Sequence, residues 1–183
     1  RDWSSDVCSS DLIGLEKALP GARRRGVYEP AVVVCSDRAH HACVTVANWL
    51  GLGEAHVETI PTADDNRMRL DALDARLRTL VREGRRIACI VATMGTTDAF
   101  GLDDLEGIVH VRDALVRAEG LAYVPHVHAD AVIGWAWSVF NDYDFERNPL
   151  GFRHRTVRAL AGTVRRIRHL RLADSLGVDF HKT

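Results

Sequence analysis

The chain has 183 residues, which is enough for one compact domain with a hydrophobic core. Its hydrophobic fraction of 46% and charged fraction of 27% are those of ordinary globular proteins and exclude disordered and fibrous classes. The formal net charge of −1 argues against binding to nucleic acid through overall charge, and the longest apolar stretches (31–35 and 87–92) are too short to cross a membrane.

The first eleven residues (RDWSSDVCSSD) are rich in serine and aspartate and have no apolar period. We therefore set residues 1–11 apart from the fold as a non-native or disordered segment, and expect residues 12–183 to form the folded part. No basic region followed by an apolar one is visible near the N-terminus, so a secretory signal is not predicted.

The apolar pattern beyond this segment alternates between helical and extended periods. In chain order it predicts a helix at 12–19, strand 31–35, helix 41–50, strand 56–60, helix 70–81, strand 87–92, helix 105–120, strand 121–127, helix 155–170 and strand 173–178. Such alternation predicts an α/β fold with a mainly parallel sheet flanked by helices. Ligands of these sheets bind at the carboxyl ends of the strands.

The chain has four cysteines, which form no CxxC pair: Cys8, Cys35, Cys43 and Cys89. Cys35 and Cys89 lie inside apolar runs. They predict buried free thiols in a reducing compartment, with the cytoplasm as the expected location. Lysine is rare in the chain. Lys17 and Lys182 are its two lysines, so any chemistry that needs an amine falls on one of them.

Polar side chains follow four of the predicted strands: His40, then Thr96 and Thr97, then His128 and Asp130, and finally His181 and Lys182. Catalysis by pyridoxal phosphate needs a lysine amine that holds the cofactor as an imine and an anion that faces the pyridine nitrogen. It also uses a flat ring that stacks on the cofactor and a hydroxyl near the phenolic oxygen. Lys182, Asp130, His40 and Thr97 match these needs.

The motifs around these residues are SDRAHH (36–41), VATMGTT (91–97), HADA (128–131) and DSLGVDFHK (174–182). In order and spacing they resemble those of the group II pyridoxal-phosphate-dependent amino-acid decarboxylases. The resemblance covers nearly all of residues 12–183 and implies part of the large cofactor-binding domain of the aspartate aminotransferase-like fold. It also implies that the phosphate-binding loop and the small C-terminal domain of that family are missing, so we expect the chain alone to be inactive.

Residue roles follow from the same resemblance. Lys182 would hold pyridoxal phosphate, Asp130 would pair with its pyridine nitrogen, and His40 would stack over its ring. Thr97 would lie near the phenolic oxygen or the imine, and His181 near the phosphate. Val132 would lie beneath the ring, where the family usually has a small residue. Asp179 departs from the family, which often has an asparagine there as a phosphate contact, because its charge would repel a phosphate unless it is offset.

The implied activity is the decarboxylation of an L-amino acid to an amine and carbon dioxide by a cytoplasmic homodimer. Glutamate, aspartate, diaminobutyrate and aromatic amino acids all remain open as the small-molecule substrate. No metal, nucleic acid or membrane is expected to bind. One alternative is another enzyme of the same fold, such as an aminotransferase, an aldolase or a desulfurase-like lyase.

Other interpretations concern single segments. The arginine-rich helix at 153–171 is either a nucleic-acid-binding face or the solvated side of an amphipathic helix. His126, His128 and Asp130 alternate and so face one way, as metal ligands or as buried hydrogen-bonding groups. Trp135, Trp137 and Phe140 line either a substrate entrance or an aromatic core.

Overall fold

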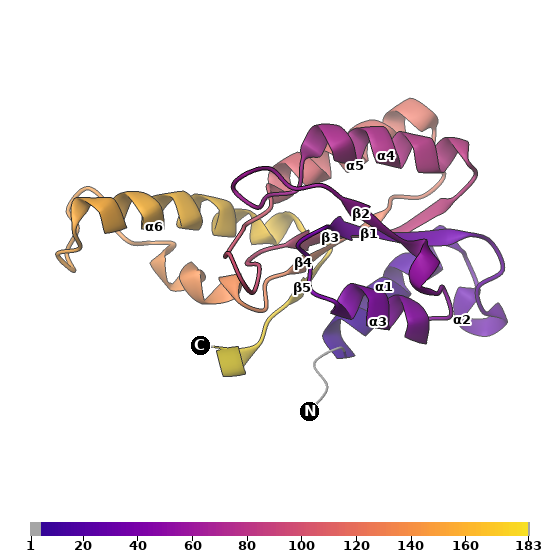
Figure 1. Cartoon of the computed structure of the whole chain (residues 1–183), viewed down its shortest axis with the longest axis horizontal. Helices are drawn as coiled ribbons and strands as arrows, with labels where there is room; N and C mark the ends of the chain where they lie inside the picture. The colour runs from indigo at the N-terminus through magenta and orange to yellow at the C-terminus, as the bar shows by residue number, and fades with distance from the viewer. Residues whose placement is uncertain (1–4, 183) are drawn as a thin grey trace.

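The computed structural model describes the backbone of residues 5–182 and the side chains of residues 11–181. Its helices and strands alternate along most of the chain (Figure 1). They are α1 (Ser5–Ala18), α2 (Ala22–Arg25), β1 (Ala31–Ser36), α3 (Ala42–Trp49), β2 (Val57–Ile60), α4 (Leu70–Arg82), β3 (Arg86–Thr93), α5 (Leu105–Glu119), β4 (His126–Asp130), α6 (His154–Ile167) and β5 (Ser175–Gly177). Short 3-10 turns are η1 (Glu54–His56), η2 (Gly134–Phe140), η3 (Arg168–Leu172) and η4 (Phe180–Lys182).

All five strands form one parallel sheet in the order β2-β1-β3-β4-β5, which confirms the predicted α/β architecture. A parallel sheet places the carboxyl ends of its strands at one edge. The register aligns Thr93 of β3 with Asp130 of β4, and Asp130 with Gly177 of β5. The polar residues that follow these strands therefore converge.

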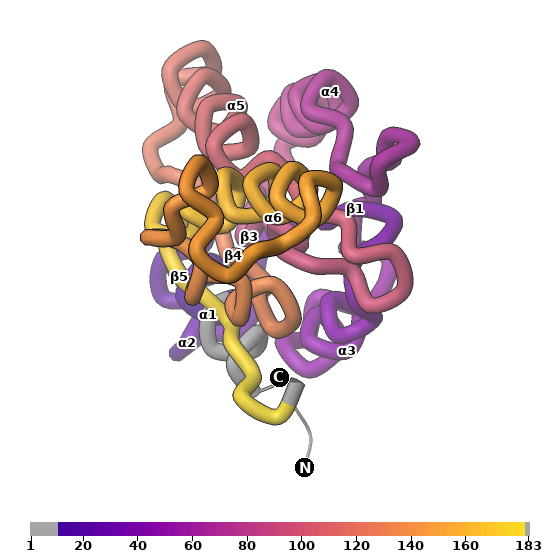
Figure 2. Tube along the Cα trace, turned by 90° about the vertical axis from the view of Figure 1, so that its left-hand side faces the viewer, coloured from indigo at the N-terminus to yellow at the C-terminus, as the bar shows by residue number. Residues whose placement is uncertain are grey.

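Helices cover both faces of the sheet, with α4 and α5 on one side and α1 and α3 on the other (Figures 1 and 2). Alternate residues of β1 feed the two cores: Val32 and Val34 pack with the α4–α5 layer, and Val33 and Cys35 with the α1–α3 layer. This is why strands β1 and β3 are apolar between their ends, at 31–35 and 87–92, as strands buried on both faces must be.

A bulge interrupts the alternation in β3. Val32 pairs with Ile87 and the next residue, Val33, pairs with Cys89, so Ala88 is extra and joins Cys89 on the α1 face. Helix α1 passes so close to this point that a Cβ on Gly14 would lie 2.3 Å from the Ala88 carbonyl oxygen. The bulge and the glycine together let α1 lie directly on the sheet.

Two expectations about the elements need correction. Residues 1–11 are expected to be non-native or disordered; helix α1 begins at Ser5, so residues 5–11 are helical in backbone rather than disordered, and the Asp11 side chain is buried. The strand predicted at 121–127 is wrong: β4 starts at His126. Pro125 has no N–H to donate to a neighbouring strand, and the unpaired Ile87 N–H of β3 instead donates to the Tyr123 hydroxyl at 2.8 Å.

The helix predicted at 155–170 divides into α6 and the turn η3, and the strand predicted at 173–178 shortens to β5. Helix α6 extends beyond the end of the sheet, with η2 beneath it (Figure 1). Its apolar residues Leu160, Val164 and Ile167 are buried, and most of its arginines lie on the opposite, solvated side. None of the helices in residues 5–182 is both long and apolar enough to cross a membrane.

The cysteines with described side chains, Cys35, Cys43 and Cys89, are buried free thiols, as predicted. The Cys8 side chain lies outside the described residues. Contact with the Cys35 thiol, followed by burial, raises the pKa of Cys43 well above its ordinary value. Burial does the same to the pKa of Cys89.

Candidate active site

The loops that follow β1 and β3 enclose a cavity of about 310 Å³ at the carboxyl edge of the sheet. It brings together two residues predicted from sequence, His40 and Thr97, which are 57 positions apart in the chain and exposed to solvent. The other lining residues are Arg38, Ala39, His41, Thr96, Asp98 and Ala99. Asp130, Val132 and His181 do not line this cavity and lie on the neighbouring segments after β4 and β5.

His40 sits in the turn between β1 and α3. Its Nδ1 accepts a hydrogen bond from the Ala42 backbone N–H at 3.2 Å, which places the imidazole at the start of the helix. The ring of His41 lies against it, with the two ring centroids 4.1 Å apart and tilted by 39°. Both histidines line the cavity and are exposed to solvent.

The buried side chain of Asp103 fixes the turn after β3 through two hydrogen bonds. One carboxylate oxygen accepts from the Thr93 N–H at 2.8 Å and the other from the Met68 N–H at 2.6 Å. Burial raises the pKa of Asp103 to about 6, against the opposing effect of these two hydrogen bonds. The N-cap of α5 is the adjacent Asp104, which accepts from the Gly107 N–H at 3.1 Å, so the two aspartates have separate tasks.

The Thr96 side chain closes this turn, since its hydroxyl accepts from the Gly101 N–H at 2.8 Å. Thr97 is left pointing to the exposed rim of the cavity. Both threonines follow β3, as predicted; Thr96 is buried and holds the turn, whereas Thr97 is exposed.

Asp130 is the last residue of β4 and is half-buried. One of its carboxylate oxygens accepts from the backbone N–H of Val132, which is itself half-buried, at 3.3 Å. The chain then passes very close to the turn after β3: a Cβ on Gly134 would lie 1.9 Å from the Met94 carbonyl oxygen. Only glycine allows the segments that carry Thr97 and Asp130 to meet here.

Asp179 and His181 lie after β5. The buried Asp179 carboxylate accepts from the His181 backbone N–H at 2.8 Å, and the exposed His181 imidazole Nδ1 is 3.4 Å from the same oxygen. Lys182 ends η4, and its side chain lies outside the described residues. The prediction that its amine holds the cofactor thus stays a prediction.

Four buried polar atoms at or near this edge have no hydrogen-bond partner among the described residues: Ser36 Oγ, Thr93 Oγ1, His128 Nε2 and an Asp179 oxygen. Buried polar atoms are nearly always paired, so a group of orphans points to a polar ligand. Thr93 pairs with Asp130 and shares its face of the sheet, and Asp179 follows β5, whereas Ser36 continues the α4–α5 face of β1. The residues present therefore fit a polar cofactor such as pyridoxal phosphate.

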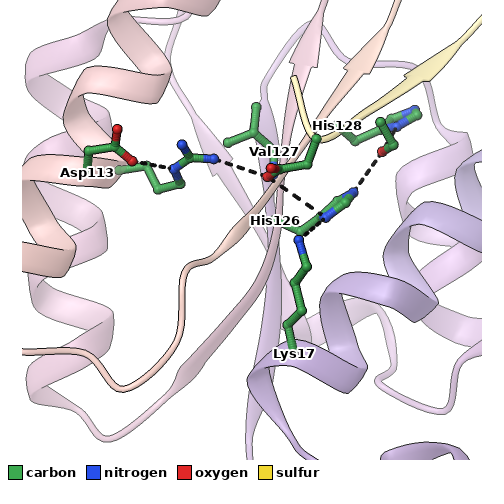
Figure 3. Close-up of polar contacts among 8 residues, drawn as sticks. Lys17, Asp113, His126, Val127 and His128 are labelled. Carbon is green, nitrogen blue, oxygen red and sulfur yellow. Dashed lines mark hydrogen bonds and ion pairs between the residues drawn. The ribbon is translucent and has the colours of Figure 1, made fainter. Parts of the chain in front are cut away.

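His126 and His128 lie inside β4, not beyond its end, and are almost fully buried. They join a polar network with residues of α1, α5 and β5 (Figure 3). Arg112 donates to Asp113 and to Asp174, and Asp174 also accepts from the Val127 N–H at 2.8 Å. Among the described side chains, no group of three histidines, cysteines or acids is arranged to hold a metal ion.

The aromatic residues of η2 belong mainly to packing contacts. The Trp135 indole donates to the Asp179 carbonyl at 3.0 Å and its ring meets that of Phe180 at 4.8 Å between centroids. Trp137 packs edge-on against Phe100, which lies next to the cavity-lining Ala99.

Ser36, Thr93, Asp103 and Gly134 are not predicted as site residues from the sequence. The position of Ser36 and Thr93 as last residues of buried strands is a signal that could find them. The roles of Asp103 and Gly134 depend on contacts between distant segments, for which the sequence offers no local pattern.

Comparison with known proteins gives a consistent result. A family model described as "Pyridoxal-dependent decarboxylase conserved domain" matches residues 14–140. The L-2,4-diaminobutyrate decarboxylase of Acinetobacter baumannii is 31% identical over 187 residues, covering 100% of this chain and 30% of that protein. The aspartate 1-decarboxylase of Aliivibrio fischeri is 29% identical, covering 96% of this chain and 28% of that protein. This chain thus spans less than a third of the length of these relatives.

Among solved structures, Oryza sativa TDC with PLP and tryptamine superposes with a TM-score of 0.71 at 19% identity, covering 98% of this chain and 32% of that chain. The likeness establishes the fold, that of the aspartate aminotransferase-like enzymes. The family match at residues 14–140 includes His40, Thr97, Asp130 and Val132, and it ends before His181 and Lys182.

Proposed function

The chain belongs to the pyridoxal-dependent decarboxylase family, and from this membership we propose that the protein binds pyridoxal phosphate and decarboxylates an L-amino acid to the amine and carbon dioxide. Bound pyridoxal phosphate supplies an electron sink for the electron pair that remains on Cα when the carboxylate leaves. The observation that carries the proposal is the meeting of His40 and Thr97 in one cavity, beside the Asp130 strand end and a group of orphaned buried polar atoms.

Each predicted site residue has a task in this proposal. Asp130 provides the anion for the pyridine nitrogen, and Val132 packs beneath the ring. His40 offers its flat face to the cofactor, Thr97 donates its hydroxyl near the phenolic oxygen, and His181 lies by the phosphate. The Lys182 amine holds the cofactor covalently.

The direct test measures the products formed by the intact protein loaded with pyridoxal phosphate. We expect release of carbon dioxide and an amine from one or more amino acids, with L-2,4-diaminobutyrate and aspartate tried first because two relatives are named for them. Formation of a keto acid without carbon dioxide would instead support an aminotransferase of the same fold.

Lys182→Ala tests the assignment of the amine. It should abolish the visible absorption of the bound cofactor, because Lys17 is the only other lysine and its amine contacts His126 in the network below β4. Lys17→Ala is the matched control and should retain the absorption. A persistent band in Lys182→Ala would contradict the assignment.

We also propose that the protein acts as a homodimer in the cytoplasm. Large apolar side chains exposed on η2 and before α6, Val139 at 73% and Leu150 at 63%, offer a surface for a second copy. The buried free thiols Cys35, Cys43 and Cys89 are typical of a reducing compartment. Sedimentation equilibrium of the intact protein and of Val139→Asp tests the first point, since the variant should shift the mass toward the monomer.

A further inference from the structure

The cavity between the loops after β1 and β3 carries charge of opposite sign on its two walls. The turn after β1 contributes the basic side chains of Arg38, His40 and His41. The loop after β3 contributes Asp98, which is the one acid among the described residues that line the cavity. The proposed function gives Asp98 no task, although it directly follows Thr97.

Neither Arg38 nor Asp98 is neutralised by another side chain of the protein. Both residues are exposed, and among the described residues neither side chain makes a hydrogen bond or an ion pair. Arginines elsewhere on the surface do pair with acids, as Arg78 does with Asp74 at 3.0 Å. The charge of Asp98 is therefore available to a ligand in the cavity.

The loop that carries Asp98 is fixed by hydrogen bonds between its ends. The Thr96 N–H donates to the Gly101 carbonyl at 3.0 Å, and the Gly101 N–H donates to the Thr96 hydroxyl at 2.8 Å. The Phe100 N–H donates to the Thr96 carbonyl at 3.1 Å. A Cβ on Gly101 would lie 2.5 Å from the Asn66 carbonyl oxygen, so the loop also lies directly against the segment before α4.

The backbone of this loop is strained two residues after Asp98. Phe100 has a φ of +50°, in the left-handed region that a bulky side chain rarely adopts. Its ring packs edge-on against Trp137, with the centroids 5.8 Å apart. Strain of this kind persists where surrounding contacts impose it, and it is concentrated at ligand-binding sites. A fixed and strained loop that presents one acid to a cavity has the features of a binding element.

The chemistry of an amino-acid substrate indicates which group Asp98 would meet. Every L-amino acid has an α-carboxylate, which suits the basic wall of the cavity and is common to all candidate substrates. The substrate amine reacts at the aldehyde carbon of pyridoxal phosphate, which is attached next to the ring carbon that bears the phenolic oxygen. Thr97 has its proposed place near that oxygen, so we expect the substrate side chain to lie by the adjacent Asp98.

We propose that Asp98 is a specificity-determining residue that binds a cationic group on the substrate side chain, so that the protein prefers an L-amino acid with a second amine. The inference rests on the proposed function, because it assumes that an amino acid is decarboxylated in this cavity. An ammonium group donates a charge-assisted hydrogen bond to the Asp98 carboxylate. A side-chain carboxylate is repelled by it, and an apolar side chain gains nothing from it.

Three variants of the intact protein, loaded with pyridoxal phosphate, test the proposal. Asp98→Asn keeps the size of the side chain and removes its charge, whereas Asp98→Glu keeps the charge. Asp64→Asn is the matched control, because Asp64 is exposed on the segment before α4 and does not line the cavity. The matched substrates are L-2,4-diaminobutyrate and L-2-aminobutyrate, which differ only in the second amine.

We expect wild type to have the higher kcat/KM for L-2,4-diaminobutyrate. Asp98→Asn should lower this kcat/KM about tenfold and leave that of L-2-aminobutyrate within about twofold, the size of one hydrogen bond between charged groups. Asp98→Glu should retain most of the preference, and Asp64→Asn should leave both values within about twofold.

Two binding measurements are independent of turnover. Calorimetric titration with 1,3-diaminopropane, the amine that L-2,4-diaminobutyrate would yield, should show about tenfold weaker binding to Asp98→Asn than to wild type. The dissociation constant of pyridoxal phosphate should stay within about twofold, because the loop is held by backbone contacts that the variant keeps.

The outcomes separate the inference from the function beneath it. If wild type releases carbon dioxide from no amino acid, the proposed function fails and the role of Asp98 fails with it. If wild type decarboxylates L-2-aminobutyrate or L-aspartate at least as efficiently as L-2,4-diaminobutyrate, the preference alone is overturned. Equal losses for both matched substrates in Asp98→Asn, or the same selective loss in Asp64→Asn, would also overturn it.

Discussion

Two buried side chains, His128 and Asp103, give the stability of the fold opposite dependences on pH. Burial, followed by the nearby His126, lowers the pKa of His128 to about 4. Between pH 6.5 and 4, His128 is therefore protonated in the unfolded chain but neutral in the folded chain. The free energy of unfolding falls as the pH falls through this range. The pKa of Asp103 is raised to about 6 in the folded state, so the folded chain binds this proton at a higher pH than the unfolded chain does. The contribution of Asp103 to the free energy of unfolding therefore falls as the pH rises from about 4 to 6.

We expect these two contributions, each on the order of 3 kcal/mol, to offset one another in wild type. His128→Gln should leave the Asp103 effect exposed, so that the free energy of unfolding rises as the pH falls from 6.5 to 4.5. Asp103→Asn should show the reverse, with a steeper loss of stability over the same range. Denaturant unfolding at several pH values measures both, and curves parallel to wild type would contradict the assignment.

The charge of Asp179 is expected to affect the affinity for pyridoxal phosphate. Its carboxylate is buried and oriented by the His181 N–H, and it stands where a neutral residue would suit a phosphate. Asp179→Asn keeps the acceptor for His181 and removes the negative charge. We expect pyridoxal phosphate to bind about threefold to tenfold more tightly to the variant, measured by equilibrium titration of the intact protein. Weaker binding would place the phosphate elsewhere.

At the scale of elements, the contact between the turn after β3 and the start of η2 sets the geometry of the site. Gly134 makes that contact possible because nothing larger fits against Met94. The same contact involves Gly95, at φ +124, where an added Cβ would lie 3.0 Å from the Gly134 nitrogen. Any shift of this contact separates the Thr97 turn from Asp130.

Gly134→Ala should therefore destabilise the protein by about 3 kcal/mol or more, and weaken cofactor binding as well. Gly162→Ala is the matched control: this glycine lies within α6, and an added Cβ would meet nothing within 4 Å. It should stabilise the protein by about 0.5–1 kcal/mol through helix propensity. Thermal unfolding of the two variants measures the contrast, and similar melting temperatures would refute the clash.

Sequence periodicity predicts most of these elements because each is amphipathic or fully apolar over its own length. Helices α4 and α5 and strands β1 and β3 appear where the pattern places them, with Gly84 and Gly120 in the left-handed conformation after the helices. The strand predicted at 121–127 is misplaced because the apolar residues before Pro125 have the pattern of a strand but do not pair with β3. Because His40, Thr97 and Asp130 end or follow strands, the sequence predicts that they lie at the same edge of the sheet.

The parts of the site that sequence does not predict depend on packing between distant segments. The Asp103 anchor needs Met68 and Thr93, and the hydrogen bond between Lys17 and His126 joins residues that are 109 positions apart. His128 reads as a ligand or a loop residue in the sequence, and only burial against Ser175 reveals its single orphaned nitrogen.

For the whole molecule, the buried thiols offer a probe of cooperative opening. Cys35, Cys43 and Cys89 are at most 3% exposed, and both the burial and the raised pKa of Cys43 and Cys89 suppress reaction in the native state. In a Cys8→Ser background, we expect thiol labelling of the native protein to follow the free energy of unfolding across a denaturant series. A fast labelling rate that does not change with denaturant concentration would show local opening of the α1–α3 layer.

The strand order has a consequence for how the protein is made. After β2 has paired with one edge of β1, β3 adds to the other edge, β4 adds to β3 and β5 adds to β4, so the sheet grows in one direction along the rest of the chain. A domain generally folds as a unit. Lys182 is translated last of the proposed site residues, so a nascent chain would acquire the cavity between His40 and Thr97 and the amine at the same time, once β5 has joined the sheet.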